Sequence, residues 1–254
     1  MRFLVLLGVL LLAACGPPSP ATPTAALPLD AWQPWAGGEV LQTSDGISAL
    51  RHAPTAVTYG HVFEPAPAAA QPVGVWLRRY PDAAAAVNCG FFREDAAGYA
   101  HIGLLMTAGE LQAGLRSNWG GVLIVRDGSA FVAGQPQRLL APAALGVQGW
   151  PLLAMEGRAL PRLNDQEQAR RTAVGVDAAG RVVWVAAVQA RTLAEFAARL
   201  LAPDLALTAA INLDGGSSTG LRWLGEEGQL GADSLPVPCA LLLYPPEASS
   251  ASWR

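Results

Sequence analysis

The stretch Asn212-Leu213-Asp214-Gly215-Gly216-Ser217-Ser218-Thr219 determines how we interpret the fold of this chain. It completes an apolar run, Leu205 to Leu213, that is typical of a buried strand, and then adds a carboxylate, two glycines and three hydroxyls. Two glycines allow the backbone to approach a ligand closely, and free N–H groups with hydroxyls suit an anion. A plain turn has similar residues, but the neighbouring segments favour an anion-binding loop that begins at Asp214.

The residues before this loop predict a β-α-β unit from Arg181 to Leu213. Its first part is a short apolar run rich in β-branched residues, which favours a strand. The middle part, Arg191 to Leu201, has helical spacing, with Thr192 and Glu195 at capping-box positions. A right-handed crossover would make the two strands a parallel pair and place Asp214 at the carboxyl end of the second strand, where ligands bind in such units.

Further strands are predicted around tight turns that contain glycine. Arg171 to Val176 and the Arg181 strand flank such a turn, and Gly121 to Ala133 contains another. Ala83 to Asn88 is an apolar run that ends, like the Asp214 strand, in a polar residue. From these elements we expect an α+β fold: a single domain with one large, mixed, twisted β-sheet flanked by a few helices.

Four segments, in one order, resemble the phosphodiester glycosidase family. Asn88 to Phe92 is similar to the family's Asn-Gly-Gly-Phe-Phe motif, and Arg171 to Gly175 is similar to its Arg-Thr-Ala-Ile-Gly motif. Asn212 to Ser218 resembles Asn-Leu-Asp-Gly-Gly-Gly-Ser-Ser, and Leu235 to Leu241 resembles the closing Arg-Pro-Val-Pro-x-Ala-Leu. The resemblance covers most of Ala83 to Tyr244 and implies a hydrolase that acts on a sugar phosphodiester.

The resemblance and the chemistry of these residues suggest a role for each. A departing phosphate is already a stable anion, so it needs a cation and N–H donors more than a general acid. We therefore expect Arg171 to bind phosphate, Asp214 to orient the sugar or activate water, and Asn88 to position either group. Glu94 or Asp95 would supply a second carboxylate if the reaction requires one. The candidate substrate-binding residues are Thr172, Asn212, Gly215, Gly216, Ser217, Ser218 and Thr219.

Three functions fit this set of residues. The first is a glycosidase that cleaves the C1–O bond of a sugar-1-phosphodiester, in a cell-envelope glycan or its fragments. The second is a phosphodiesterase that attacks phosphorus with the same residues. The third is a lipoprotein that binds glycan without turnover. The missing glycine after Asp214, relative to the family motif, keeps the third alternative open.

The expected partner is a sugar phosphodiester, either a small molecule or a glycan, and no cofactor is expected. His52, His61 and His101 are far apart in sequence without paired ligand spacing, which argues against zinc and predicts no metal site. Asp214 and Asn212, with backbone carbonyls, offer an alternative in which a divalent cation such as calcium binds. A net charge of -3 without a basic run argues against nucleic acid. The oligomeric state is not predicted.

The N-terminal residues resemble a bacterial lipoprotein signal. Phe3 to Leu12 is apolar but too short to span a bilayer, and Leu-Ala-Ala precedes Cys15. Lipidation of Cys15 would anchor an exported protein to a membrane of the cell envelope, and an ordinary cleaved signal peptide is the alternative. The segments expected are a signal peptide over 1–14, a Pro/Ala-rich tether over 15–30, a glycosidase-like domain over 31–247 and a tail over 248–254.

Two cysteines remain besides Cys15, namely Cys89 and Cys239. Disulfides persist in exported proteins, so the two could pair. Both replace small residues of the family motifs, so a disulfide would join two strand ends near the site. Two separate buried thiols are the alternative, because a free cysteine packs like a small hydrophobic residue.

Overall fold

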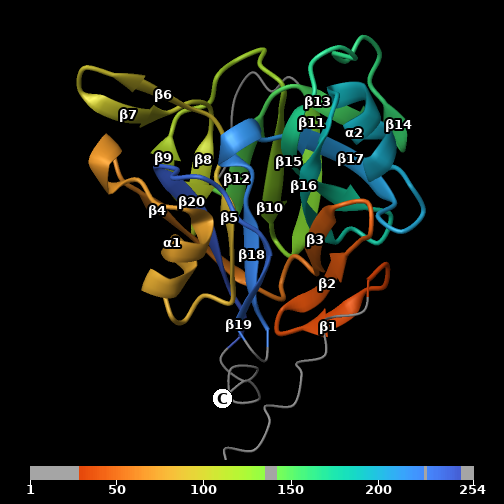
Figure 1. The fold of residues 1–254 in the computed structure, drawn as a ribbon, viewed down its shortest axis with the longest axis horizontal. Coiled ribbons are helices and arrows are strands. Elements are labelled where there is room, and N and C mark those ends of the chain that lie inside the picture. The colour runs from red at the N-terminus through yellow and green to blue at the C-terminus, as the bar shows by residue number, and fades with distance from the viewer. Residues whose placement is uncertain (1–28, 135–141, 226–227, 247–254) are drawn as a thin grey trace, which may run out of the picture.

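The computed structural model describes residues 29–134, 142–225 and 228–246 (Figure 1). The predicted signal peptide, Cys15 and the tail over 248–254 lie outside the described residues, as does the tether except for Leu29 and Asp30. None of the helices in the described segments is long and apolar enough to cross a membrane.

The largest sheet contains eight strands, and each neighbouring pair in it is antiparallel. In spatial order its strands are β1 (Gln33–Trp35), β2 (Gly38–Gln42), β3 (Ile47–His52), β16 (Val182–Arg191), β15 (Ala169–Asp177), β17 (Leu207–Asn212), β13 (Leu152–Met155) and β14 (Arg158–Ala159). The predicted hairpin that joins β15 to β16 is present, and Asp214 follows the end of β17.

Two five-stranded antiparallel sheets and a two-stranded hairpin complete the β-structure of the described residues. One five-stranded sheet has the order β11 (Ser129–Gly134), β10 (Gly121–Arg126), β12 (Leu145–Gly149), β8 (Leu105–Thr107) and β9 (Glu110–Ala113). The other has the order β19 (Gly228–Ala232), β18 (Leu221–Gly225), β5 (Ala85–Asn88), β20 (Cys239–Tyr244) and β4 (Thr58–Phe63). The hairpin pairs β6 (Phe92–Asp95) with β7 (Gly98–His101) and projects from the body of the molecule at the upper left of Figure 1.

The expected α+β class with one mixed sheet is wrong, because the fold is mainly β. Strands account for 50% of the described residues and helices for 10%, and the described sheets are antiparallel throughout. Many strands are short: β8 has three residues and β14 has two. Such short strands carry too little alternation of polar and apolar residues to stand out in the sequence.

The predicted β-α-β unit needs a second correction. Its helix is α2 (Leu193–Leu200), and the capping box between Thr192 and Glu195 is present. However, β16 and β17 do not form a parallel pair, because β15 lies between them and pairs antiparallel with both. The two strands therefore run in the same direction without pairing, and the crossover through α2 passes over β15.

The helices cover the outer faces of two sheets. Phe196, Ala197 and Leu200 of α2 pack on the eight-stranded sheet in one apolar cluster. The other α-helix among the described residues, α1 (Val73–Arg79), packs Trp76 and Leu77 against the sheet that contains β5. Figure 1 shows these two helices at opposite sides of the molecule.

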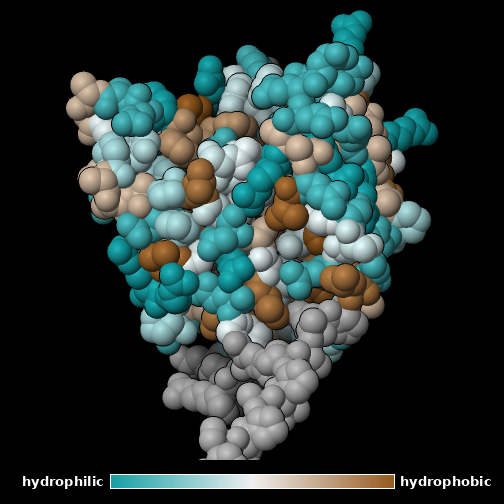
Figure 2. All heavy atoms as spheres, in the orientation of Figure 1, coloured by the Kyte–Doolittle hydropathy of each residue, from teal (hydrophilic) through white to brown (hydrophobic). Residues whose placement is uncertain are grey.

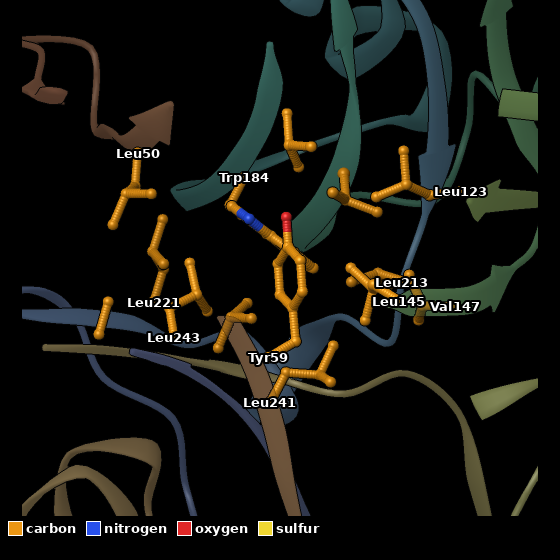
Figure 3. Packing of buried hydrophobic residues seen from close by; sticks show 14 of the residues in the cluster. Leu50, Tyr59, Leu123, Leu145, Val147, Trp184, Leu213, Leu221, Leu241 and Leu243 are labelled. Atoms are coloured by element: carbon orange, nitrogen blue, oxygen red, sulfur yellow. The ribbon is translucent and has the colours of Figure 1, made fainter. Parts of the chain in front are cut away.

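The main core lies between the sheets. Trp184 of the eight-stranded sheet, Leu123 and Leu145 of the β10 sheet, and Leu221 and Leu241 of the β5 sheet meet in this cluster (Figure 3). All five side chains are fully buried, so each contributes roughly 1.5–3 kcal/mol or more through the hydrophobic effect. On the face shown in Figure 2, hydrophobic residues are scattered among polar ones. The core thus fixes how the sheets, and the strand ends they carry, lie relative to one another.

Candidate active site

Asp214 is the second residue after β17, and its side chain is half-buried. Its Oδ1 accepts a hydrogen bond from the N–H of Gly215 (3.0 Å), and the hydroxyl of Ser218 donates another to its carboxylate. Burial raises the pKa of Asp214 above its ordinary value, and these two hydrogen bonds offset part of the rise. A carboxylate with a raised pKa accepts a proton more readily than an exposed one, which suits a catalytic base.

The two glycines that follow Asp214 have different functions in the loop over residues 213–220, here called the Asp214 loop. A Cβ added to Gly215 would lie 2.7 Å from the carbonyl oxygen of Arg170, so glycine allows the loop to pack against β15. Gly216 has a φ of 58°, in the left-handed region that favours glycine, and it begins the 3-10 turn η2 (Gly216–Ser218). An added Cβ there would meet open space, so the backbone of Gly216 is accessible to a ligand.

Asn88 fixes the position of the Asp214 loop. This residue ends β5 and is 1% exposed. Its Nδ2 donates to the backbone oxygen of Asp214 (2.8 Å), while its Oδ1 accepts from the hydroxyl of Thr172 (3.0 Å) and the N–H of Gly220 (3.2 Å). We predicted that Asn88 touches sugar or phosphate, but its recorded bonds are structural, and they connect two sheets at the loop.

Arg171 lies on β15, next to β17, but its recorded hydrogen bonds do not reach the Asp214 loop. Side chains alternate along a strand, and Thr172 points toward Asn88, so Arg171 points to the opposite face. Its Nε donates to the carbonyl of Arg191 (3.0 Å) and its Nη2 to that of Glu167 (2.7 Å). Nη1 bonds to none of the described residues and therefore keeps both of its donors.

Arg170, which the sequence analysis missed, is the arginine that contacts the loop. Its Nη2 donates to the carbonyls of Thr219 (3.0 Å) and Asp233 (2.7 Å). Its Nε is buried and has no partner among the described residues. Arg170 and Thr172 are two residues apart on β15, so their side chains lie on the same face of the strand. This alternation of side chains was the signal in the sequence that could have identified Arg170.

Two buried acceptors at the same strand ends have no partner among the described residues. Asn212 donates from Nδ2 to the carbonyl of Trp150 (2.9 Å), but within the described segments its Oδ1 is left without a partner. The hydroxyl of Thr219 is buried and is likewise unpaired there. Trp150, which was not predicted to belong to the site, is 50% exposed beside Asn212. Its only signal in the sequence was its aromatic side chain, and an exposed indole can stack on a sugar ring.

The candidate second carboxylates, Glu94 and Asp95, lie on the exposed hairpin rather than in the Asp214 loop. Asp95 forms an exposed ion pair with Arg93 (3.3 Å). The hydrogen bonds and ion pairs recorded for the described residues connect neither carboxylate to Asp214. The site is therefore built around one carboxylate, hydroxyl groups and backbone N–H donors.

The structure joins Cys89 and Cys239 in a disulfide, with a Cα–Cα distance of 5.6 Å. His101, at the end of β7, places its Nδ1 3.8 Å from the sulfur of Cys89. In the described part of the chain, these three residues form the one group of three or more Cys, His, Asp or Glu side chains with metal-binding geometry. Asp214 lies outside that group.

Comparisons with known proteins identify the family. The sequence matches the phosphodiester glycosidase family over residues 81–244, and the chain belongs to that family. The matched range includes the predicted motifs from Asn88 to Leu241. A comparison with the sequences of curated proteins gave no significant match.

Solved structures show the same fold at low sequence identity. The catalytic domain of zebrafish N-acetylglucosamine-1-phosphodiester alpha-N-acetylglucosaminidase, auto-inhibited by its pro-peptide, has a TM-score of 0.60 at 18% identity, over 78% of this chain and 75% of that one. A hypothetical protein from Synechocystis has a TM-score of 0.59 at 17% identity, over 85% of this chain and 61% of its own length. A protein from Burkholderia pseudomallei K96243 has a TM-score of 0.57 at 15% identity, over 83% of this chain and 76% of its own length.

We expect Asn88→Ala to destabilise the protein by about 3 kcal/mol or more, because it leaves several buried polar partners unsatisfied at roughly 1–3 kcal/mol each. Urea unfolding followed by tryptophan fluorescence would measure the change. Ser129→Ala, at an exposed position of β11, is the matched control and should stay within about 0.5 kcal/mol of the parent. An unchanged midpoint for Asn88→Ala would contradict the structural role of this amide.

We expect Asp214→Asn to unfold at the same temperature as the parent, or a higher one, at neutral pH. The folded-state pKa of Asp214 is raised, so its stabilising contribution exists at low pH and is lost as pH rises through that pKa. Asparagine does not ionise and can still accept from the Gly215 N–H. Thermal unfolding should be measured for both proteins at about pH 4 and about pH 7. The unfolding temperature of the variant, relative to that of the parent, should be higher at about pH 7 than at about pH 4. Strong destabilisation at about pH 7 would make Asp214 a structural residue instead.

Proposed function

We propose that this protein is a glycosidase that cleaves the C1–O bond of a sugar-1-phosphodiester in cell-envelope glycans or their fragments. Membership of the phosphodiester glycosidase family supports a substrate of this class. The observation that carries the proposal is Asp214, a half-buried carboxylate with a raised pKa, positioned beside a loop of hydroxyls and N–H groups. Such a site combines negative charge for a sugar cation with donors for a phosphate.

The proposed mechanism separates charge across the bond that breaks. As C1–O cleavage proceeds, positive charge develops on the anomeric carbon, and the Asp214 carboxylate stabilises it or accepts a proton from attacking water. Negative charge develops on the departing phosphate, which the N–H of Gly216 and the hydroxyl of Ser217 are placed to bind. Arg170, whose Nη2 contacts the carbonyl of Thr219, is the candidate cation for the same phosphate, in place of the predicted Arg171, which faces away from the loop. No general acid is needed, because the phosphate leaves as a stable anion.

Two acceptors and an aromatic side chain are proposed to recognise the sugar. Asn212 Oδ1 and Thr219 Oγ1 are buried without partners among the described residues, so sugar hydroxyls could satisfy them. The exposed indole of Trp150 offers a stacking surface next to Asn212. Loss of a stacked or hydrogen-bonded sugar group would weaken binding rather than change which bond breaks.

The position of the oxygen taken from water tests the proposed bond cleavage. We expect a soluble form of residues 29–254, incubated with a panel of sugar-1-phosphodiesters in heavy-oxygen water, to place the label in the sugar. Rapid quenching and reduction of the free sugar prevent exchange at the anomeric hydroxyl, and mass spectrometry locates the label. Asp214→Asn should lose nearly all turnover, and its intact folding would already be known from thermal unfolding.

Each other result identifies another function. Label in the phosphate would overturn the glycosidase and support a phosphodiesterase that attacks phosphorus. Binding of the diesters with no turnover across the panel would support a non-catalytic glycan-binding lipoprotein. Full turnover in Asp214→Asn, with loss in Glu94→Gln, would move the carboxylate role to the exposed hairpin.

We further propose that the protein acts as an exported lipoprotein anchored through Cys15. The support for this is the short apolar segment followed by Leu-Ala-Ala-Cys at the N-terminus. Labelled palmitate should enter the full-length chain expressed in a bacterium, and Cys15→Ser should abolish the label and release the protein from membranes. Membrane association without label in both forms would overturn lipid anchoring.

A further inference from the structure

Three side chains that are distant in sequence meet beside the end of β5. Cys89 follows that strand, Cys239 begins β20, and His101 ends β7. Their potential ligand atoms all lie within 4.8 Å of one another, and His101 Nδ1 is 3.8 Å from the Cys89 sulfur. The other two histidines have different neighbours: His52 accepts from the indole of Trp184 (3.2 Å), and His61 contacts the hydroxyl of Thr107 (3.0 Å).

The donor set fits a soft or borderline divalent metal ion. Two cysteine sulfurs and one imidazole are typical ligands of zinc, and three protein ligands leave a fourth tetrahedral position open. The Cα–Cα distance of 5.6 Å between the cysteines already brings both sulfurs to one point.

A cleft beside these residues would provide access for the ion. The cleft has a volume of about 460 Å³ and is lined by His101 together with Tyr99 and Arg93 of the hairpin and His61 of β4. His101 Nε2 is buried without a partner among the described residues, so the ring is not held in place by a hydrogen bond at that atom. Small adjustments of the ring and of the hairpin can therefore optimise the metal–ligand distances.

We propose that Cys89, Cys239 and His101 form a metal site that exists only when the disulfide is reduced, and that it takes a thiophilic dication such as Zn²⁺. A dithiol reductant transfers two electrons and two protons to the disulfide and becomes a cyclic disulfide itself. The two cysteine thiols then bind the ion as thiolates and release their protons to solvent. Metal binding and the disulfide exclude one another, because the same two sulfur atoms are used.

The test uses Co²⁺ as a spectroscopic probe on the soluble chain over residues 29–254. After reduction with a phosphine and removal of oxygen, we expect about one equivalent of Co²⁺ to give thiolate charge-transfer and tetrahedral d–d bands. Zn²⁺ should displace it. The oxidised protein should show neither band. Zn²⁺ should also slow re-formation of the disulfide by a mild oxidant, since it occupies both thiolates.

Variants separate this site from adventitious binding. His101→Ala should weaken Co²⁺ binding by at least about tenfold, and Cys239→Ser should abolish the thiolate bands. His61→Ala is the matched control, because His61 lines the same cleft without belonging to the donor set. Its Co²⁺ affinity should equal that of the parent.

Three outcomes would overturn the proposal. The first is the absence of thiolate bands in reduced protein that remains folded by near-ultraviolet circular dichroism. The second is an affinity in folded His101→Ala equal to that of His61→Ala. The third applies if reduction unfolds the chain. Zn²⁺ should then restore the folded spectrum of the parent, and restore that of His101→Ala less well. Failure of Zn²⁺ to do so would overturn the proposal.

Discussion

The buried amide of Asn88 connects the Asp214 loop to two sheets. Its three hydrogen bonds reach the backbone of Asp214, the hydroxyl of Thr172 and the N–H of Gly220. Because the residue is 1% exposed, water cannot easily replace any of these partners. Thr172 belongs to the eight-stranded sheet and Asn88 to a five-stranded one, so this amide aligns the two sheets where the carboxylate emerges.

This arrangement separates the groups that hold the site from those that remain free. The amide of Asn88 and one nitrogen of Arg170 are occupied by backbone contacts with the loop, whereas Asn212 Oδ1 and Thr219 Oγ1 lie buried without partners in the described part of the chain. An unsatisfied buried polar group costs roughly 1–3 kcal/mol, so such groups require an explanation. A polar ligand that pairs with them would recover that cost on binding. Burial also makes the charge of Asp214 unfavourable in the free protein, and an opposite charge that develops nearby would offset this cost.

Local sequence patterns predicted individual elements better than their arrangement. The capping box of α2, the hairpins and the position of Asp214 after a buried strand all depend on residues close in sequence. The placement of β15 between β16 and β17 could not be predicted, because strand order depends on long-range pairing that local periodicity does not encode. Arg170 was not predicted for a related reason. The family motif contains Arg171, but the alternation of side chains along β15 determines which arginine faces the loop.

The same long-range pairing explains why His101 could not be associated with the cysteines. Pairing of Ala240 with Asn88 brings Cys239 beside Cys89, and the hairpin returns His101 to the same strand end. Comparing the histidines only with one another therefore gave no metal-ligand spacing. Asn88 and Cys89 are adjacent, and one bonds to the Asp214 loop while the other bonds to Cys239. The disulfide and the amide that positions Asp214 therefore belong to adjacent residues at the end of β5.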